Sequence, residues 1–149
     1  MDTNNELFYA YLAGFIDADG SISISTVAHN KNQVVALAAH NCKYAPIELL
    51  HNMFGGKVRL KKTGKCRNEI NWRPCYEWKL TANKAIAVIK KLLPYLMIKK
   101  TQAILAIRLQ RLKNKYRGKR QWDSKIDAKC ERVYSRIKAK CVALNKRGI

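Results

Sequence analysis

Residues 7–21 read LFYAYLAGFIDADGS, and this stretch decides how we expect the chain to fold. At the helical period of 3.6 residues its large apolar side chains form one broad face, made of Leu7, Phe8, Tyr11, Leu12, Phe15 and Ile16. Small residues recur every four positions on the flank of that face, namely Ala10, Gly14 and Ala18, with Ala13 beside them. Small side chains let a second helix backbone approach closely. We therefore expect a helix that packs on its own core and also against a partner helix.

Two carboxylates fall in the last turn of this expected helix. Gly20 can take the left-handed conformation that ends a helix, which leaves Asp17 and Asp19 just before the end. The C-terminal end of a helix carries partial negative charge and disfavours acids, so a cation is expected nearby. If a two-fold copy packs along the small residues, two Asp19 side chains converge and suit Mg²⁺. The alternative is an ordinary turn with solvated acids.

Residues 12–20, LAGFIDADG, resemble the signature of the LAGLIDADG homing endonucleases and differ from it only by Phe15 in place of leucine. The chain holds one copy, which is similar to the single-motif, homodimeric branch of that family. The resemblance implies that Asp19 binds the metal, that the Ala18 carbonyl assists, and that Asp17 has a mainly structural role. It also implies a dimer interface along the first helix, with Ala10, Ala13, Gly14, Asp17 and Ala18.

The composition indicates one intracellular domain that binds a polyanion. The 149 residues suffice for one domain, and 30 Lys and Arg against 10 Asp and Glu give a formal net charge of +20. This excess favours nucleic acid as the partner over an anionic membrane. We find neither an apolar run long enough to span a bilayer nor a signal-peptide pattern, and we expect a soluble protein of the cytoplasm or an organelle. Five cysteines without a C-x-x-C pair indicate free thiols.

The remaining sequence predicts two strand pairs, each followed by a helix. Alternating or apolar segments predict strands at 21–25, 34–39, 57–61 and 70–80, the last interrupted by Pro74. Helices are predicted at 46–54, 81–93 and 99–112, the last with Ala103, Ile104, Ile107 and Leu109 as its apolar positions. The plan is α+β, α-ββ-α-ββ-α with an antiparallel sheet and extra C-terminal helices, and the resemblance implies the same plan, with the sheet as a DNA-binding saddle.

We expect a core domain at 1–112 and a basic C-terminal helical extension at 113–149, packed on the same domain. The final segment is compatible with either a packed helix or a mobile basic arm.

One face of the predicted sheet is basic and is expected to be open to a partner. Lys57, Arg59 and Lys61 alternate along one strand without compensating acids, and Arg73 and Lys79 share a parity on another. A twisted antiparallel ribbon fits the major groove of DNA, whereas an ordinary solvated surface mixes charges of both signs. The expected DNA contacts are Ser23, Ser25, Lys31, Gln33, His40, Lys57, Arg59, Lys61, Lys65, Arg67, Asn71, Arg73, Glu77, Lys79, Lys113, Lys115 and Arg117.

Further catalytic candidates come from the resemblance. Residues 94–103, PYLMIKKTQA, are similar to the family's segment between the last two core helices, where a lysine reaches the active site; here that lysine is Lys99. The family also uses a polar residue at the end of the second strand, often glutamine, and this sequence departs from that pattern. Counting back from the helix at 46–54 selects Asn41, counting forward selects Lys43, and His40 is a further alternative.

The resemblance implies a site-specific endonuclease that cuts both strands of a long, partly palindromic DNA site and leaves 3′ overhangs. Its cofactor would be Mg²⁺ or another divalent cation such as Mn²⁺ or Ca²⁺, its partners double-stranded DNA and a second copy of itself, and its gene commonly lies in an intron. Two alternatives stay open. One is an RNA maturase that assists intron splicing, and the other is a non-catalytic DNA-binding regulator on the same scaffold.

Overall fold

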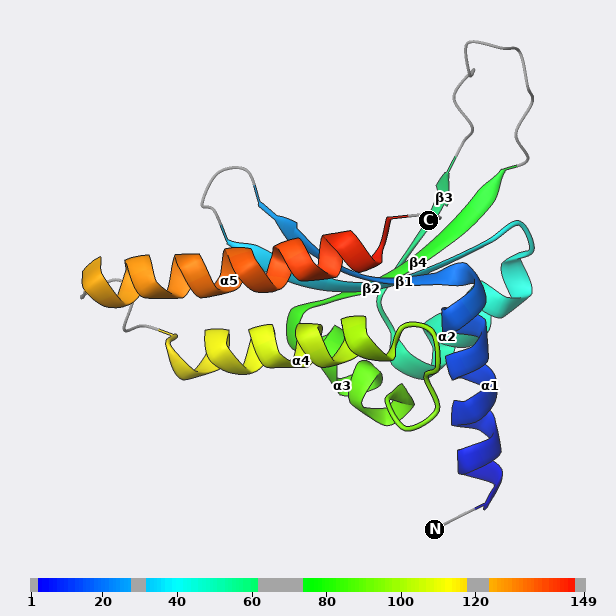
Figure 1. Cartoon of the computed structure of the whole chain (residues 1–149). Coiled ribbons are helices and arrows are strands. Elements are labelled where there is room, and N and C mark those ends of the chain that lie inside the picture. Colours follow the sequence, from blue (N-terminus) through cyan, green and yellow to red (C-terminus); the bar gives the residue numbers. More distant parts are fainter. Residues whose placement is uncertain (1–2, 28–31, 62–73, 118–123, 147–149) are drawn as a thin grey trace.

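The computed structural model describes residues 3–27, 32–61, 74–117 and 124–146 (Figure 1). Its elements follow the order α1 Thr3–Asp19, β1 Gly20–Thr26, β2 Gln33–Asn41, α2 Tyr44–Phe54, β3 Lys57–Lys61, β4 Cys75–Thr81, α3 Ala82–Leu92, α4 Lys100–Lys115 and α5 Ser124–Leu144. The predicted α+β plan is therefore confirmed. Five predicted DNA contacts lie outside the described residues, namely Lys31, Lys65, Arg67, Asn71 and Arg73.

The four described strands form one antiparallel sheet in the order β1-β2-β4-β3. Its register places Ile22 opposite Leu37 and Ala39 opposite Trp78. All four side chains are buried, because these positions face the helices. Successive residues of a strand point to opposite faces, so their neighbours point to the other, open face. The alternation of the sequence thus decides which residues can meet a partner.

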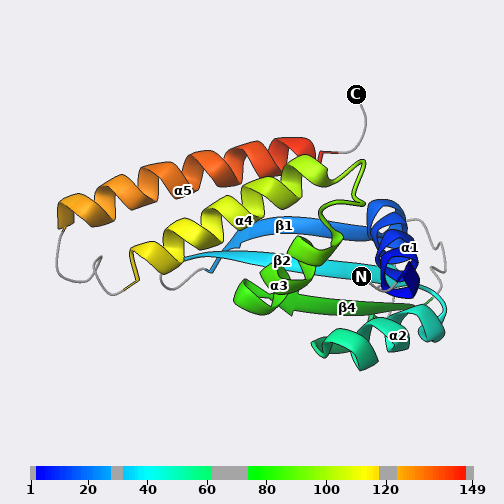
Figure 2. The ribbon, with the colours of Figure 1, turned by 90° about the horizontal axis from the view of Figure 1, so that it is seen from below.

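The helices cover one face of the sheet. Figures 1 and 2 show α3 and α4 lying side by side across that face, and α1 leaving it at one end. Trp78 is fully buried beneath α2, where its indole Nε1 donates a hydrogen bond to the Gly55 carbonyl at 2.7 Å. Phe54 packs near the same indole, with ring centroids 6.3 Å apart. The helix α2 thereby closes the core over β4.

The helix α1 is buried on a narrower side than its sequence predicts. Leu12, Ala13 and Ile16 are buried, whereas Leu7 is 72% and Tyr11 62% exposed. We expected Leu7 and Tyr11 on the same broad apolar face as Leu12 and Ile16, but both lie on the side of the helix that also carries the small residues. The exposed side of α1 is therefore an apolar stripe, made of Leu7, Ala10, Tyr11, Gly14 and Ala18.

Gly20 does not end α1 through a left-handed conformation. The only described glycines with positive φ are Gly55 and Gly56, after α2. Gly20 is instead the first residue of β1, and a Cβ built on it would lie 2.8 Å from both the Cα and the carbonyl oxygen of Ile16. This position therefore needs glycine because the strand starts in contact with the helix backbone.

The segment at 124–144 is a packed helix rather than a mobile arm. The helix α5 contacts α4 and β1, and it buries Cys130, Tyr134, Ile137 and Cys141. The described residue that follows it, Asn145, donates to the Ile22 carbonyl at 2.9 Å. The helix α4 continues to Lys115, so the division of the chain at residue 112 stays a prediction. No helix among the described residues is long and apolar enough to cross a membrane.

Candidate active site and nucleic-acid interface

Asp19, the last residue of α1, faces the end of β2. The Asn41 amide Nδ2 donates a hydrogen bond to Asp19 Oδ2 at 3.3 Å, and both side chains are open to solvent. The two residues meet because α1 runs directly into β1, which pairs with β2 in the register Gly20 opposite Ala39. The turn after α1 and the last residue of β2 therefore lie at the same end of the sheet. This end is the candidate active site.

Asn41 is the only one of the three polar candidates that contacts Asp19 among the described residues. Its Oδ1 accepts a hydrogen bond from the Lys43 backbone N–H at 2.8 Å, which fixes the amide so that Nδ2 points at Asp19. The described hydrogen bonds involve Lys43 only through its backbone, while the His40 ring lies on the open face. The geometry favours Asn41 as the polar residue of the site.

Asp17 points into the chain and organises the segment that carries Lys99. Its Oδ2 accepts backbone hydrogen bonds from Met97 at 2.8 Å and Ile98 at 3.1 Å, and its Oδ1 accepts one from Lys99 at 2.9 Å. The side chain is only 9% exposed. Three donors around one carboxylate make it a structural anchor between α1 and the residues before α4. This agrees with the structural role that we expected for Asp17.

Lys99 supplies the cation that the end of α1 requires. Its Nζ donates a hydrogen bond to the Asp17 backbone carbonyl, in the last turn of the helix where the dipole is negative. The ammonium is therefore held at a backbone carbonyl that lies two residues before Asp19, next to the candidate site. An ammonium carries three N–H donors, so this bond leaves Lys99 with donors for another oxygen.

Two thiols border the candidate site, and sequence reasoning gave them no role there. Extending the register of β2 and β4 places Cys42 opposite Cys75, and the Cys75 thiol donates to the Tyr76 carbonyl at 3.8 Å. Burial raises the pKa of Cys75, and the neighbouring Cys42 adds to the rise. The antiparallel pairing of β2 with β4 was the signal that could have placed Cys42 and Cys75 opposite each other. Cys130 and Cys141 are also free and lie in the core.

A charged cluster occupies the open face beside the site. The Glu77 carboxylate lies 3.1 Å from both the His40 Nε2 and the Lys61 Nζ. Burial alone would raise the pKa of Glu77, but hydrogen bonds and charge from Lys61 and His40 outweigh it, and the pKa lies below its usual range. The cluster is formed by three neighbouring strands, since His40 pairs with Glu77 in register and Lys61 lies on β3.

Most of the described residues that we expected to contact DNA lie on the open face. By register and parity this face carries Ser23, Ser25, His40, Lys57, Arg59, Lys61, Glu77 and Lys79. A hollow beside β3 and β4 is lined in part by Lys57, Arg59, Glu77 and Lys79. Lys115 and Arg117 are exposed near the end of α4, and their contact with DNA stays a prediction.

Two residues of the expected DNA-binding set are corrected. Gln33 is 6% exposed and shares the parity of Val35 and Leu37, so its side chain lies under the helices and not on the open face. Lys113 is half-buried, and its Nζ donates to the Gln33 backbone carbonyl. Its ammonium therefore ties α4 to the start of β2. The sequence pattern alone did not show that α4 runs beneath this strand.

Two residues of the expected dimer interface are corrected as well. Ala13 is fully buried in the core of the single chain, and the Asp17 carboxylate is engaged with residues 97–99. Neither side chain is accessible to a partner. Ala10, Gly14 and Ala18 are exposed, and a Cβ built on Gly14 would meet nothing within 4 Å. The exposed stripe of α1 is thus open where the sequence predicts a close helix contact.

A sequence model of the family described as LAGLIDADG endonuclease matches residues 12–107 of the chain. The chain belongs to the LAGLIDADG endonuclease family. The match runs from the second half of α1 through the first half of α4, and so includes Asp19, Asn41 and Lys99. No curated protein sequence matched the chain.

Solved structures confirm the fold of this LAGLIDADG endonuclease. The homing endonuclease I-CvuI, in complex with a DNA target in the presence of Mg with the DNA not cleaved, superposes with a TM-score of 0.75. Its identity is 22%, over 99% of this chain and 87% of that one. The archaeal intron-encoded homing endonuclease I-Vdi141I, complexed with DNA, gives a TM-score of 0.72 at 16% identity, over 97% and 87% of the two chains. At these identities the likeness shows the fold.

The donor set at the end of α1 fits a hard divalent cation only in part. Asp19 offers an exposed carboxylate. Among the described residues, no group of three or more His, Cys, Asp or Glu side chains could hold a metal ion. Mg²⁺ is usually held by one or two carboxylates together with substrate phosphates, so a single carboxylate is compatible with an ion that needs further oxygens from outside the chain.

Proposed function

We propose that the chain is a site-specific DNA homing endonuclease that acts as a homodimer and cuts both strands of its target with the help of divalent cations. The observation that carries this proposal is the meeting of Asp19, Asn41 and Lys99 at the end of α1, next to the basic open face of the sheet. Family membership supports the reaction class. The protein I-CvuI has been crystallised with its target in the presence of Ca, which supports the cofactor class.

The homodimer follows from the exposed stripe of α1. Leu7 and Tyr11 expose most of their apolar surface, while Ala10, Gly14 and Ala18 leave room for a second backbone. A two-fold copy packed on this stripe buries the apolar side chains and brings two helix ends together. Because Asp19 is the last residue of α1, the two Asp19 carboxylates then lie near the two-fold axis. The second carboxylate and a DNA phosphate complete the oxygen ligands that one chain lacks.

DNA lies on the open face in this proposal. Lys57 and Arg59 on β3 and Lys79 on the neighbouring β4 share the open face and reach the base edges and phosphates of the major groove. His40 and Glu77 add donors and acceptors near the candidate site. This face ends beside Asp19, so a duplex lying along it presents its phosphodiester bonds to the site.

The residues of the site have separate tasks. Asp19 holds the divalent cation, assisted by the Ala18 carbonyl. When bound, the cation activates a water and stabilises charge on the phosphate and the leaving oxygen. Asn41 orients the Asp19 carboxylate through Nδ2 and offers its amide to a water. Lys99, held at the helix end by the Asp17 carbonyl, donates its remaining N–H groups to a phosphate oxygen and balances its charge.

The test is cleavage of a duplex that contains the uninterrupted insertion site of the host intron, with and without Mg²⁺. We expect cutting of both strands, with 3′ overhangs, only when a divalent cation is present. The control is Asp19→Asn, which should bind the same duplex without cutting it. Tight binding by the wild type without nicking in Mg²⁺, Mn²⁺ or Ca²⁺ would instead indicate the regulator. Binding of intron RNA in preference to the duplex would indicate the maturase.

A further inference from the structure

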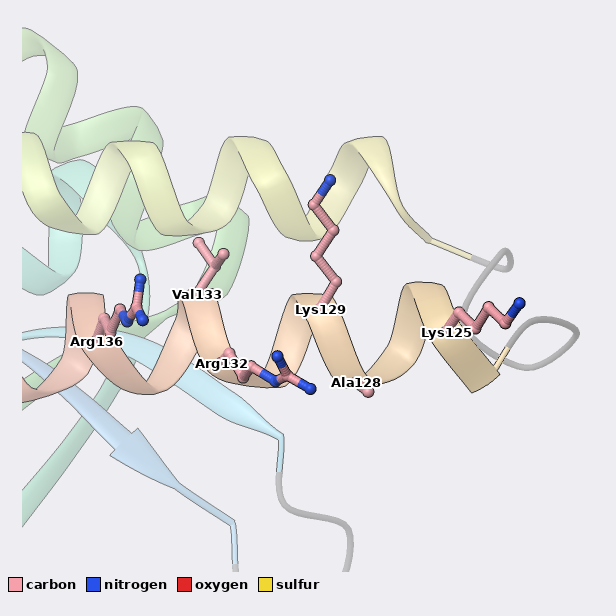
Figure 3. Close-up of a pocket in the computed structure, with 6 residues that line it drawn as sticks. All are labelled: Lys125, Ala128, Lys129, Arg132, Val133 and Arg136. Atoms are coloured by element: carbon pink, nitrogen blue, oxygen red, sulfur yellow. The ribbon is translucent and has the colours of Figure 1, made fainter.

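The outer side of α5 carries a second basic surface that the proposed function does not use. A shallow depression there is lined by Lys125, Ala128, Lys129, Arg132, Val133 and Arg136 (Figure 3). Lys140 continues the same side one turn further on. We call Lys129, Arg132, Arg136 and Lys140 the α5 stripe. All four side chains are exposed.

The α5 stripe points away from the open face of the sheet. The flank of α5 that faces β1 is marked by Lys138, whose Nζ donates to Thr26 Oγ1 at 2.7 Å. The stripe lies on the opposite flank, and Figure 3 shows Lys129 rising toward α4 together with Val133. Figures 1 and 2 both show α5 alongside α4, at the outer side of the β1 edge. A duplex on the open face therefore does not cover the stripe.

Within the described part of the chain, no hydrogen bond or ion pair engages Lys129, Arg132 or Arg136. The acids of the helix, Asp127 and Glu131, lie on its other flank by helical periodicity, so positive charge is segregated and not mixed. Like charges four residues apart, such as Arg132 and Arg136, destabilise a helix. A polyanion bound along the stripe would offset this repulsion.

The geometry fits a phosphate backbone. From Lys129 to Lys140 the helix rises about 16 Å, and it presents four cations along that line. Double-stranded DNA presents one negative charge for every ~1.7 Å of its axis. The residues that line the depression include no aromatic side chain on which unpaired bases could stack, which favours a duplex over a single strand.

We propose that the α5 stripe binds the backbone of a second segment of double-stranded DNA, without sequence preference, while the open face holds the target. A second segment of the same DNA molecule is present at high effective concentration once the target is bound. The protein therefore bridges two DNA segments, and its affinity for long DNA exceeds its affinity for a short target duplex.

The test is a capture assay in EDTA, where no cleavage occurs. A short duplex that contains the target is fixed to beads, the protein is bound to it, and a labelled duplex of unrelated sequence is added. We expect the wild type to retain the labelled duplex, and Arg132→Gln combined with Arg136→Gln to retain at least about tenfold less. The same double variant should bind the immobilised target within about twofold of the wild type, because it leaves the open face intact.

The matched control removes two exposed lysines from another helix, with Lys90→Gln and Lys91→Gln on α3. It should retain the labelled duplex like the wild type. The proposal is overturned if the α5 double variant captures as much as the wild type, if the control loses capture equally, or if a labelled RNA hairpin is captured in preference to the duplex. Failure of the wild type to bind the immobilised target would count against the proposed function instead. In that case, comparing the affinities of the wild type and the α5 double variant for the labelled duplex would test the α5 stripe independently of the target.

Discussion

Asp17 and Asp19 are two residues apart, yet their surroundings assign them opposite tasks. The Asp17 carboxylate is buried and accepts three backbone hydrogen bonds from residues 97–99. The Asp19 carboxylate is exposed and touches one amide, that of Asn41. On a helix, two residues apart means a rotation of about 200°, so one carboxylate points into the chain when the other points out. Substituting each in turn should separate stability from activity.

Asp19→Asn should lower the cleavage rate by orders of magnitude while leaving the fold intact. The change keeps the shape of the side chain and removes the charge that holds the cation. A carboxylate in the last turn of a helix costs ~0.3–1 kcal/mol, so thermal stability should hold or rise slightly. DNA affinity measured without metal should also hold or rise, because a negative charge near the phosphates is gone. Wild-type cleavage rates in this variant would refute the metal assignment.

Asp17→Asn should act mainly on stability. An asparagine has one acceptor oxygen where Asp17 uses two, and its NH₂ group would face a backbone N–H. Leaving buried donors unsatisfied costs ~1–3 kcal/mol, so the melting temperature should drop by several degrees, more than for Asp19→Asn. Cleavage by the folded fraction should suffer less than with Asp19→Asn. A melting temperature equal to that of the wild type would contradict the anchoring role.

Glu77→Gln should show what the charged cluster contributes. Because the pKa of Glu77 is lowered in the folded protein, its pairing with Lys61 and His40 stabilises the fold above the ordinary glutamate range and is lost as the pH falls through the lowered pKa. The stability difference between wild type and variant, ~1 kcal/mol or less, should therefore be present at pH 7 and shrink as the pH falls below the ordinary range of a glutamate. Denaturant unfolding across pH measures it, and a difference that grows in acid would contradict the assignment.

At the scale of the element, α1 packs one side on its own core and exposes the other, which the proposed dimer would bury. Gly14→Leu should leave the single chain folded, since a Cβ at Gly14 meets nothing within 4 Å. In the proposed dimer it should force the helices apart at a cost of ~1–3 kcal/mol or more per site. Light scattering should show a dimer for the wild type and a monomer for the variant, with matching circular dichroism.

Gly20→Ala is the contrast for that experiment. Its new methyl group would lie within 3 Å of the Ile16 backbone, which cannot move aside cheaply. This variant should lose thermal stability whatever its oligomeric state. A wild type that is monomeric both with and without DNA would remove the dimer from the proposed function.

At the scale of the whole molecule, the net charge of +20 is divided between the open face and other surfaces. We expect affinity for a fixed duplex to fall steeply with salt, with a slope of about −0.9 per phosphate contact on a double logarithmic plot. Arg59→Ala should also lower discrimination between target and unrelated sequences, because Arg59 lies on the open face. Lys115→Ala should weaken binding of both DNAs alike. Affinity that hardly changes with salt would exclude the open face as a DNA surface.

The sequence by itself determined the elements, the family and the faces of the sheet. Residues 12–20 marked the helix and its terminal carboxylates, and alternation along 57–61 separated Val58 and Leu60 from the cations. These predictions succeeded because each depends on the local geometry of one helix or strand. A strand has only two faces, so the alternation of its residues already shows which side chains share a face.

Only the tertiary structure decided what surrounds each side chain. Periodicity gives the angles between residues of a helix but not its rotation against the sheet. It therefore could not show that Leu7 and Tyr11 of α1 and Ile104 of α4 are exposed. The hydrogen bonds of Asp17 and Lys113 join residues about eighty positions apart, and no local pattern encodes them. Asn41 is favoured over Lys43 because β2 ends at Asn41, whose amide hydrogen-bonds to Asp19, and that contact between residues 22 positions apart depends on how β2 pairs with the strand that follows α1.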